Sequence, residues 1–339
     1  MAGQPPAPWA VAVSGGGDSL ALMHLLSGYA RVHRLPAPVV LTVDHGLRKS
    51  SARETRQVAA WAKEIGLAVQ MLAWRGASPK HKGGIEAAAR EARYRLMGEW
   101  LAGKEIATLF VGHTQDDQAE TFLLRLARGS GLDGLAGMRA LAPWPLPGFP
   151  QLGVARPLLN FSREQLRLYL KAKGRTWLED PMNEDPNFDR VKIRKARAAL
   201  TEAGLSAARI AGAAVHLARA RESLEIATQA VLLRAARGSQ DGRGVLLDPA
   251  ALAAAPREMG LRSLASVLMA VGGQIYRPRF DSLERVFDQI AGSGLGAGAT
   301  LHGCHIRPLT RREKAFPPFS LIVLPENPRK TGSSTGGRG

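Results

Sequence analysis

Between residues 9 and 127, four short apolar runs alternate with four longer segments whose apolar residues recur every three or four positions. The apolar runs occupy residues 9–15, 37–46, 68–74 and 106–113, and the amphipathic segments occupy residues 19–33, 53–66, 84–103 and 116–129. Short strands that are separated by helices pair in parallel, because each connection must cross back over the sheet. The alternation therefore predicts an α/β fold with a doubly wound parallel sheet, whose ligands bind beyond the carboxyl ends of the strands.

The loop after the first predicted strand reads Ser14-Gly15-Gly16-Gly17-Asp18-Ser19. Glycines let the backbone approach a ligand closely, and a helix that begins behind them offers N–H groups and the positive end of its dipole. The spacing fits neither the P-loop, which needs Lys-Ser/Thr, nor the G-x-G-x-x-G dinucleotide loop. A tight turn that merely needs glycine is the alternative, but the two serines add hydroxyl donors and favour a phosphate site. Asp18 beside a phosphate implies a bridging Mg²⁺.

Polar residues follow two other predicted strands. Asp44 and His45 end the second strand, where a nucleobase could lie, and His113 ends the fourth. Asp117 and Glu120 follow His113 and lie three residues apart, so they share one face of the next helix. Carboxylates at a helix start also stabilise its dipole, which is the purely structural alternative. Two acids on one face beside His113 favour a site for a cation or an amine.

A formal net charge of +17 at pH 7 favours a polyanionic partner such as nucleic acid or an anionic membrane surface. Basic residues gather at Arg190, Lys192, Arg194 and Arg197, and three of these share a helix face. A solvated basic face is the alternative, but the overall charge favours contacts with nucleic-acid phosphates.

The 339-residue chain is long enough for about two domains. Residues 129–160 are loop-rich, with no regular element expected across the prolines, and Ser162 is a candidate N-cap for the helix that follows. We expect an α/β domain over residues 1–204, a smaller, mainly helical domain with glycine-turn hairpins over 205–326, and a disordered basic tail over 327–339. We expect no membrane span, no secretory signal and, with Cys304 as the single cysteine, no internal disulfide, which together fit the cytoplasm.

The loop at residues 14–19 resembles the S-G-G-x-D-S loop of the PP-loop ATP pyrophosphatases, which split ATP between the α and β phosphates and adenylate a substrate. Five further motifs occur in the order found in the members of this family that attach lysine to an isoleucine tRNA: residues 43–48, 86–97, 112–138, 155–159 and 177–194. The match covers roughly the first 200 residues. One departure is Val191-Lys192, where the family usually has Asn-Arg.

The resemblance implies a catalytic domain with the adenine nucleotide alpha hydrolase-like fold, a tRNA-binding second domain, and ATP and Mg²⁺ as cofactors. ATP would adenylate the C2 oxygen of the wobble cytidine in tRNA(Ile) with a CAU anticodon, and free L-lysine would displace AMP to give lysidine. The implied ATP-binding residues are Ser14, Gly15, Gly16, Gly17, Asp18, Ser19, Asp44 and His45. The implied catalytic residues are Asp18, Arg93, His113, Asp117 and Glu120, with Asp18 and Asp117 at the metal. Lysine would contact Asp117, Glu120 and Arg194, and tRNA would contact Arg190, Lys192, Arg194 and Arg197.

Three other functions remain as alternatives at this stage. A tRNA 2-thiolase uses the same adenylation but needs cysteine to carry sulfur, and Cys304 lies in the far domain. An amidating synthetase would explain neither the charge nor the basic helix. A non-catalytic RNA-binding protein would not need an intact loop at residues 14–19. A homodimer is also left open.

Overall fold

The computed structural model describes residues 8–46, 50–75, 84–179, 189–274, 276–292, 294–310 and 317–326. Contacts between residues divide the chain into two compact units, Met1–Arg219 and Ala220–Gly339. Each unit has its own sheet and its own core.

The N-terminal unit is built on a six-stranded sheet with the order β3-β2-β1-β4-β6-β5. All neighbours pair in parallel except β5 and β6, which are antiparallel. The doubly wound parallel sheet predicted from the sequence is therefore confirmed. The strands are β1 (Trp9–Ala12), β2 (Val39–Asp44), β3 (Val69–Ala73), β4 (Thr108–Phe110), β5 (Leu141–Pro143) and β6 (Gly153–Ala155).

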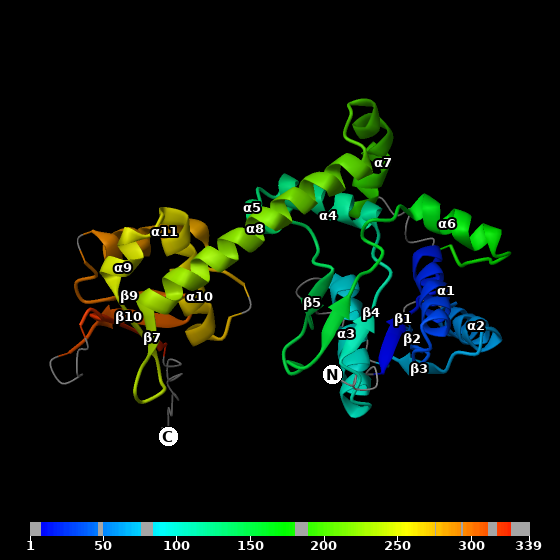
Figure 1. Ribbon diagram of the computed structural model, residues 1–339, viewed down its shortest axis with the longest axis horizontal. Helices are drawn as coiled ribbons and strands as arrows, with labels where there is room; N and C mark the ends of the chain where they lie inside the picture. The colour runs from blue at the N-terminus through cyan, green and yellow to red at the C-terminus, as the bar shows by residue number, and fades with distance from the viewer. Residues whose placement is uncertain are drawn as a thin grey trace, which may run out of the picture. The chain divides into compact units, whose positions relative to one another are not determined.

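Helices cover both faces of this sheet, because alternate residues of each strand point to opposite sides. Val11 and Val13 enter one core with buried residues of α1, α2 and α6, whereas Ala10 enters a second core with residues of α3. Figure 1 shows α1 and α2 lying together against β1, β2 and β3. The helices of this unit are α1 (Gly17–Val32), α2 (Ser51–Glu64), α3 (Gly84–Gly103), α4 (Gln115–Ala127), α5 (Leu132–Leu135), α6 (Arg163–Ala172) and α7 (Asp189–Glu202).

The strand order places a topological switch point at β1. The chain proceeds from β1 outward to β2 and β3 and then returns to the other side of β1 as β4. The connections after β1 and β4 therefore diverge to opposite sides, which leaves room for a ligand where these two strands end. Residues 13–19 and 111–114 form these two strand ends.

Residues 129–160 are largely loop, as expected, but they also contain the short helix α5 and two strands. β6 extends the parallel sheet beside β4, and β5 adds the antiparallel edge. The strands have three residues each, too few to show a period in the sequence. Pro143 ends the edge strand β5, where a missing N–H is tolerated.

The C-terminal unit combines helices with a five-stranded antiparallel sheet of order β7-β8-β11-β10-β9. The predicted glycine-turn hairpin is present as β9 and β10, which are joined at His302-Gly303. The remaining elements are β7 (Ala236–Gly238), β8 (Val245–Leu247), β9 (Ala299–Leu301), β10 (Cys304–Pro308), β11 (Leu321–Pro325), α9 (Pro249–Ala254), α10 (Arg257–Gly272) and α11 (Phe280–Ala291).

Helix α8 (Ala207–Ala235) runs through the boundary between the two units, which lies at Arg219–Ala220 rather than near the expected residue 204. The first half of α8 packs with the N-terminal unit, while Val231 and Ala235 enter the core of the C-terminal unit. The expected tail at residues 327–339 lies outside the described residues. Among the helices that the structure describes, none has the length and apolar character needed to cross a bilayer.

Candidate active site

The glycine-rich loop after β1 is closed by its own serines. The Ser14 backbone N–H donates to Ser19 Oγ at 3.2 Å, and Ser19 Oγ donates to the Gly16 carbonyl at 3.0 Å. Helix α1 begins at Gly17 and no side chain caps it. The first turn of α1 therefore presents its N–H groups to the loop, as an anion site requires.

Trp177 and Leu178 pack directly against this loop. The Leu178 N–H donates to the Gly15 carbonyl at 3.0 Å. Gly15 has φ +95°, and a Cβ atom there would lie 2.6 Å from Leu178 Cδ1. A Cβ at Gly17 would lie 3.5 Å from the Trp177 ring. Glycine at position 15 is thus required by its conformation and by this neighbour, in addition to any requirement of a bound phosphate.

The loops after β1 and β4 meet at Gly112. A Cβ at Gly112 would lie 3.0 Å from the backbone of Asp18 and Ser19. Thr114 then caps α4, and the Asp117 carboxylate returns the interaction through Oδ2, which accepts both the Thr114 N–H and its hydroxyl at 2.8 Å. The residues of α4 from Asp116 to Thr121 are buried, Asp117 and Glu120 among them.

Arg163 joins acids at the start of α1 to acids at the start of α4. Its Nε lies 3.0 Å from Asp18 Oδ2, its Nη2 lies 2.7 Å from Asp117 Oδ1, and its Nη1 lies 3.3 Å from Glu120 Oε1. Its backbone N–H donates to Asp116 Oδ2 at 2.8 Å. Three carboxylates that the sequence motifs had singled out therefore converge on one guanidinium group.

Sequence reasoning missed Arg163, although a signal was present. Ser162 caps α6 as predicted, with a reciprocal bond from Gln165, so Arg163 is the first residue of this helix. A cation is unfavourable at the positive end of a helix dipole. An arginine in that position indicates nearby acids that compensate for it.

Arg194 binds the same cluster from α7. Its Nε donates to Glu120 Oε1 at 2.6 Å and its Nη2 donates to Glu120 Oε2 at 3.1 Å, so the contact is bidentate. Charge-assisted bonds of this geometry are strong and directional. Asp116, Glu120, Ile193 and Arg194 also line a shared hollow between α4 and α7.

The environment separates the acids electrostatically. Burial raises the pKa of Asp18 to about 6, and the charges of Asp117 and Asp116 add to this while Arg163 opposes it. Burial also acts to raise the pKa of Asp117, but the Arg163 charge and the bonds from Thr114 outweigh it and lower that pKa. Asp117 therefore stays ionised more readily than Asp18.

The other predicted residues lie at varying distances from this cluster. His113 is half-buried at the start of the loop before α4, and its charge helps to lower the pKa of Asp117. Asp44 instead accepts bonds from the Gly46 N–H and the Ser51 hydroxyl, and so organises the end of its own strand. Arg93 on α3 and Lys192 on α7 have exposed side chains. The side chains of Arg190 and Arg197 lie outside the described residues.

The donor set of the cluster fits a magnesium ion only in part. The three acids surround Arg163, and within the described ranges no three acidic, histidine or cysteine side chains are arranged so that they could hold a metal ion by themselves. Mg²⁺ commonly takes one or two carboxylates and completes its shell with water and substrate phosphates. Asp18 and Asp117, which both face Arg163 beside the glycine-rich loop, are the oxygens suited to this role.

The chain matches the family of PP-loop domains over residues 2–199. It is 43% identical over 280 residues to a tRNA(Ile)-lysidine synthase of Ruegeria pomeroyi, which covers 81% of the chain and 64% of that relative. A tRNA(Ile)-lysidine synthase of Wolbachia pipientis is 38% identical, over 88% of the chain and 68% of the relative. One of Methylobacterium nodulans is 38% identical, over 95% of the chain and 91% of the relative. The chain thus spans less than two thirds of the first of these relatives.

Among solved structures, the U34-tRNA thiolase NcsA of Methanococcus maripaludis, determined with its 4Fe–4S cluster, has a similar fold. Its TM-score is 0.50 at 17% sequence identity, covering 65% of the chain and 73% of that structure. This likeness supports the fold alone.

Proposed function

Because the chain belongs to the tRNA(Ile)-lysidine synthase family of PP-loop enzymes, we propose that it ligates free lysine to C2 of the wobble cytidine in tRNA(Ile) with a CAU anticodon. ATP is split to AMP and pyrophosphate in the process. The observation that carries this proposal is the junction at Gly112, which puts a phosphate-type loop beside buried acids suited to a cationic amino acid.

In the first step, the loop at residues 14–19 binds the ATP phosphates through its backbone and the start of α1. The C2 oxygen of cytidine attacks the α-phosphorus, and the bond to pyrophosphate breaks. Mg²⁺ held by Asp18 and Asp117 would neutralise charge on the leaving pyrophosphate. We assign His113 and Arg93 to the reacting cytidine and the phosphates, and Asp44 and His45 to the nucleoside side of ATP.

In the second step, the lysine amine attacks C2 and AMP leaves. Lysine arrives as an ammonium ion with a side-chain pKa of about 10.4, so the site must bind the cation and then take its proton. The lowered pKa of Asp117 suits binding the cation. We therefore propose that Glu120, on the same face of α4, binds the ammonium group together with Asp117, and that the proton passes to this pair of carboxylates once adenylation has made C2 electrophilic.

The tRNA is proposed to contact α7 and the C-terminal unit. The net charge of +17 supports a polyanionic partner. The Arg194 side chain donates two hydrogen bonds to Glu120, which supports a role for Arg194 at the amino-acid pocket. Arg190, Lys192 and Arg197 remain candidates for phosphate contacts. We also propose that the enzyme acts in the cytoplasm.

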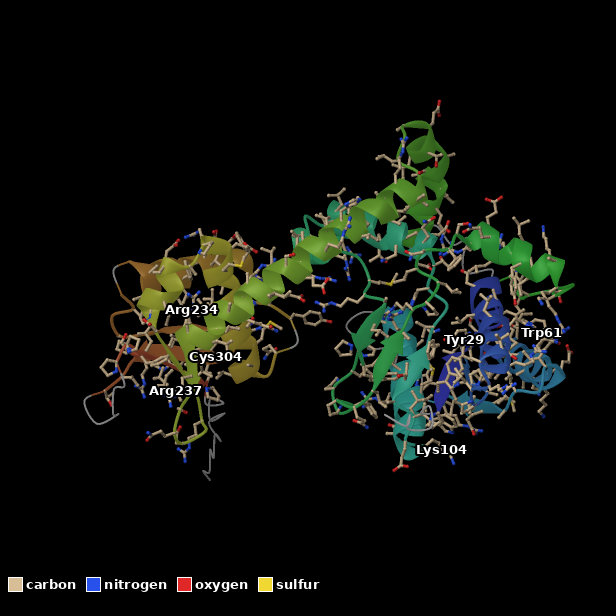
Figure 2. All side chains as sticks on the ribbon, in the orientation of Figure 1. Tyr29, Trp61, Lys104, Arg234, Arg237 and Cys304 are labelled. Atoms are coloured by element: carbon tan, nitrogen blue, oxygen red, sulfur yellow. The ribbon has the colours of Figure 1, made fainter. Side chains whose placement is uncertain are left out.

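Cys304 argues against the thiolation alternative. It is the single cysteine of the chain and lies buried in the C-terminal unit, with its thiol donating to the Leu268 carbonyl at 3.3 Å (Figure 2). Burial, with a contribution from Glu326, raises the pKa of the thiol to about 11. A buried thiol that resists ionisation is a poor sulfur nucleophile.

The proposal is tested by measuring pyrophosphate release and lysine incorporation with the cognate tRNA. Glu120→Gln should raise the KM for lysine by about tenfold or more, since a charge-assisted contact is lost, while adenylation without lysine stays near normal. Glu99→Gln, which makes the same change at an exposed position of α3, is the matched control. Normal lysine dependence in Glu120→Gln would contradict the assignment, and formation of ADP and orthophosphate would contradict the reaction type.

A further inference from the structure

Arg163 occupies the positions that the substrates would need. Its three guanidinium nitrogens each lie against a different acid: Asp18 on the ATP side, and Asp117 and Glu120 on the lysine side. The side chain of Arg163 is only 21% exposed, and the side chains of its three partners are 7% to 22% exposed. A protein cation therefore fills a buried acidic site that is assigned to incoming cations.

The oxygens of the lysine-side acids are already bonded. Asp117 Oδ2 is used by Thr114 in capping α4, so Oδ1 is the oxygen that faces the cluster, and Arg163 holds it at 2.7 Å. Glu120 Oε1 accepts from Arg163 and Arg194, and its Oε2 accepts from Arg194. An ammonium group that approaches these acids therefore meets the positive charge of Arg163 at the same oxygens.

Arg163 cannot easily break one of its three contacts while keeping the other two. The guanidinium group is planar and presents its donors in a rigid fork. Its backbone is fixed by the bond to Asp116 and by the Ser162 cap at the start of α6. Withdrawal from Asp18 therefore requires a turn of the whole fork, which weakens the contacts with Asp117 and Glu120 as well.

We propose that Arg163 is a placeholder cation that makes lysine binding depend on prior binding of Mg²⁺ and ATP. When a metal ion takes Asp18 and shares Asp117, Arg163 loses its contact with one acid and part of its contact with a second, and becomes easier to displace from Glu120. Lysine then competes with a weakened occupant, so the two ligands bind cooperatively. Arg163 is in this sense a positioning residue, which holds the acids in place and delays the amine until ATP is present. The part of this proposal that concerns lysine rests on the proposed function.

Cation binding to the protein without tRNA tests the proposal directly. Lysine affinity is measured by calorimetry with and without Mg²⁺ and α,β-methylene ATP, and Mg²⁺ affinity is measured alone. In the wild type, Mg²⁺ with the nucleotide should tighten lysine binding by about tenfold, the size expected for one charge-assisted contact. Arg163→Gln should bind lysine about tenfold more tightly without nucleotide, and the effect of nucleotide should fall to about twofold or less.

Arg175→Gln is the matched control, because it removes the same charge from an exposed pair with Glu64 and should leave every affinity unchanged. Equal or weaker binding of Mg²⁺ and lysine by Arg163→Gln would overturn the proposal, since a merely structural arginine supports the site rather than competing for it. Should that variant not fold, the wild type still decides: lysine must tighten Mg²⁺–nucleotide binding by the reciprocal factor, and absence of coupling refutes the placeholder. The measurement of Mg²⁺ affinity does not involve lysine, so it tests the role of Arg163 independently of the proposed function. The proposed function is tested separately, by lysine incorporation with the wild type.

Discussion

Two arginines, one in each unit, begin a helix and bind acids, yet they do different things. Arg163 opens α6 and Arg257 opens α10, so both place a cation at the unfavourable end of a helix dipole. Arg163 is 21% exposed and holds acids in the first turns of two separate helices, α1 and α4. Arg257 is 52% exposed and holds Glu284 and Asp288, which lie one turn apart on α11. The first pattern gathers distant residues into a site, whereas the second fastens two neighbouring helices at the surface.

The pKa values of the partner acids differ in the same way. Burial raises the pKa of Asp18 to about 6 in spite of Arg163. The Arg257 hydrogen bond lowers the pKa of Asp288. The folded protein therefore disfavours the ionised form of Asp18, which is typical of acids in ligand-binding sites. It favours the ionised form of Asp288, because Arg257 stabilises that charge.

The largest expected effect separates the two arginines by stability. Arg163→Ala leaves buried carboxylates without their shared cation, and we expect it to lower the free energy of unfolding by about 3 kcal/mol. Arg257→Ala breaks a solvated pair and should change it little. Urea denaturation of the metal-free proteins at pH 7 measures both. A similar loss in the two variants would mean that the distinction drawn from burial is wrong.

A stabilising substitution is expected at Asp18. Its raised pKa means that the folded state binds this proton more tightly than the unfolded state, so its contribution is greatest below pH 3.8 and is lost as the pH rises to about 6. Asp18→Asn mimics the neutral form and should therefore raise the free energy of unfolding at pH 8 by about 1–3 kcal/mol, while abolishing ATP turnover. Chemical denaturation at pH 4 and pH 8 should show the gain only at the higher pH. A gain of equal size at both would exclude titration of Asp18 as the cause.

High salt should increase the difference in stability effect between the Arg163 and Arg257 ion pairs. At about 1 M salt the screening length falls to about 3 Å, which weakens exposed ion pairs far more than buried ones. The difference between wild type and Arg257→Ala should therefore vanish at high salt, and the difference between wild type and Arg163→Ala should largely persist. Melting temperatures across a salt series provide the measurement, with each variant compared against the wild type at the same salt.

The smallest effect is expected for Asp288→Asn. The lowered pKa of Asp288 gives a stabilisation that is present at neutral pH and is lost as the pH falls below the ordinary value of 3.8. The variant should melt slightly below the wild type at pH 7, and the two should converge under acid conditions. A rise in melting temperature at pH 7, as predicted for Asp18→Asn, would place Asp288 in the same class as the buried acid.

Much of the fold could be predicted because its signals are local. The alternation of strands and helices, the Ser162 cap and the hairpin at β9 and β10 each depend on a few neighbouring residues. The three-residue strands β5 and β6 were missed because their pairing depends on the existing sheet rather than on their own pattern. The division inside α8 was missed because a continuous helical pattern carries no mark of which core each half joins.

The candidate site divides in the same way. The loop at residues 14–19 and the acids of α4 follow strands of the sheet, so topology alone brings them to one edge. Arg163 and Trp177 reach that edge from more than 140 residues beyond Asp18, and no local spacing predicts such contacts. The roles given to the site residues remain predictions.

Asp117 divides its two oxygens between two tasks: one completes the capping box of α4 and the other faces Arg163. Evolution at this position is therefore constrained twice. Asparagine keeps the size of the side chain but has one acceptor where two are needed, and glutamate could complete the cap, as Gln165 does in α6, but its extra methylene would shift the oxygen that faces Arg163. If the site binds lysine as proposed, a change of amino-acid specificity is expected at Glu120, Arg163 or Arg194 before Asp117. Among related sequences, we therefore expect substitutions at the arginines of the pocket more often than at Asp117.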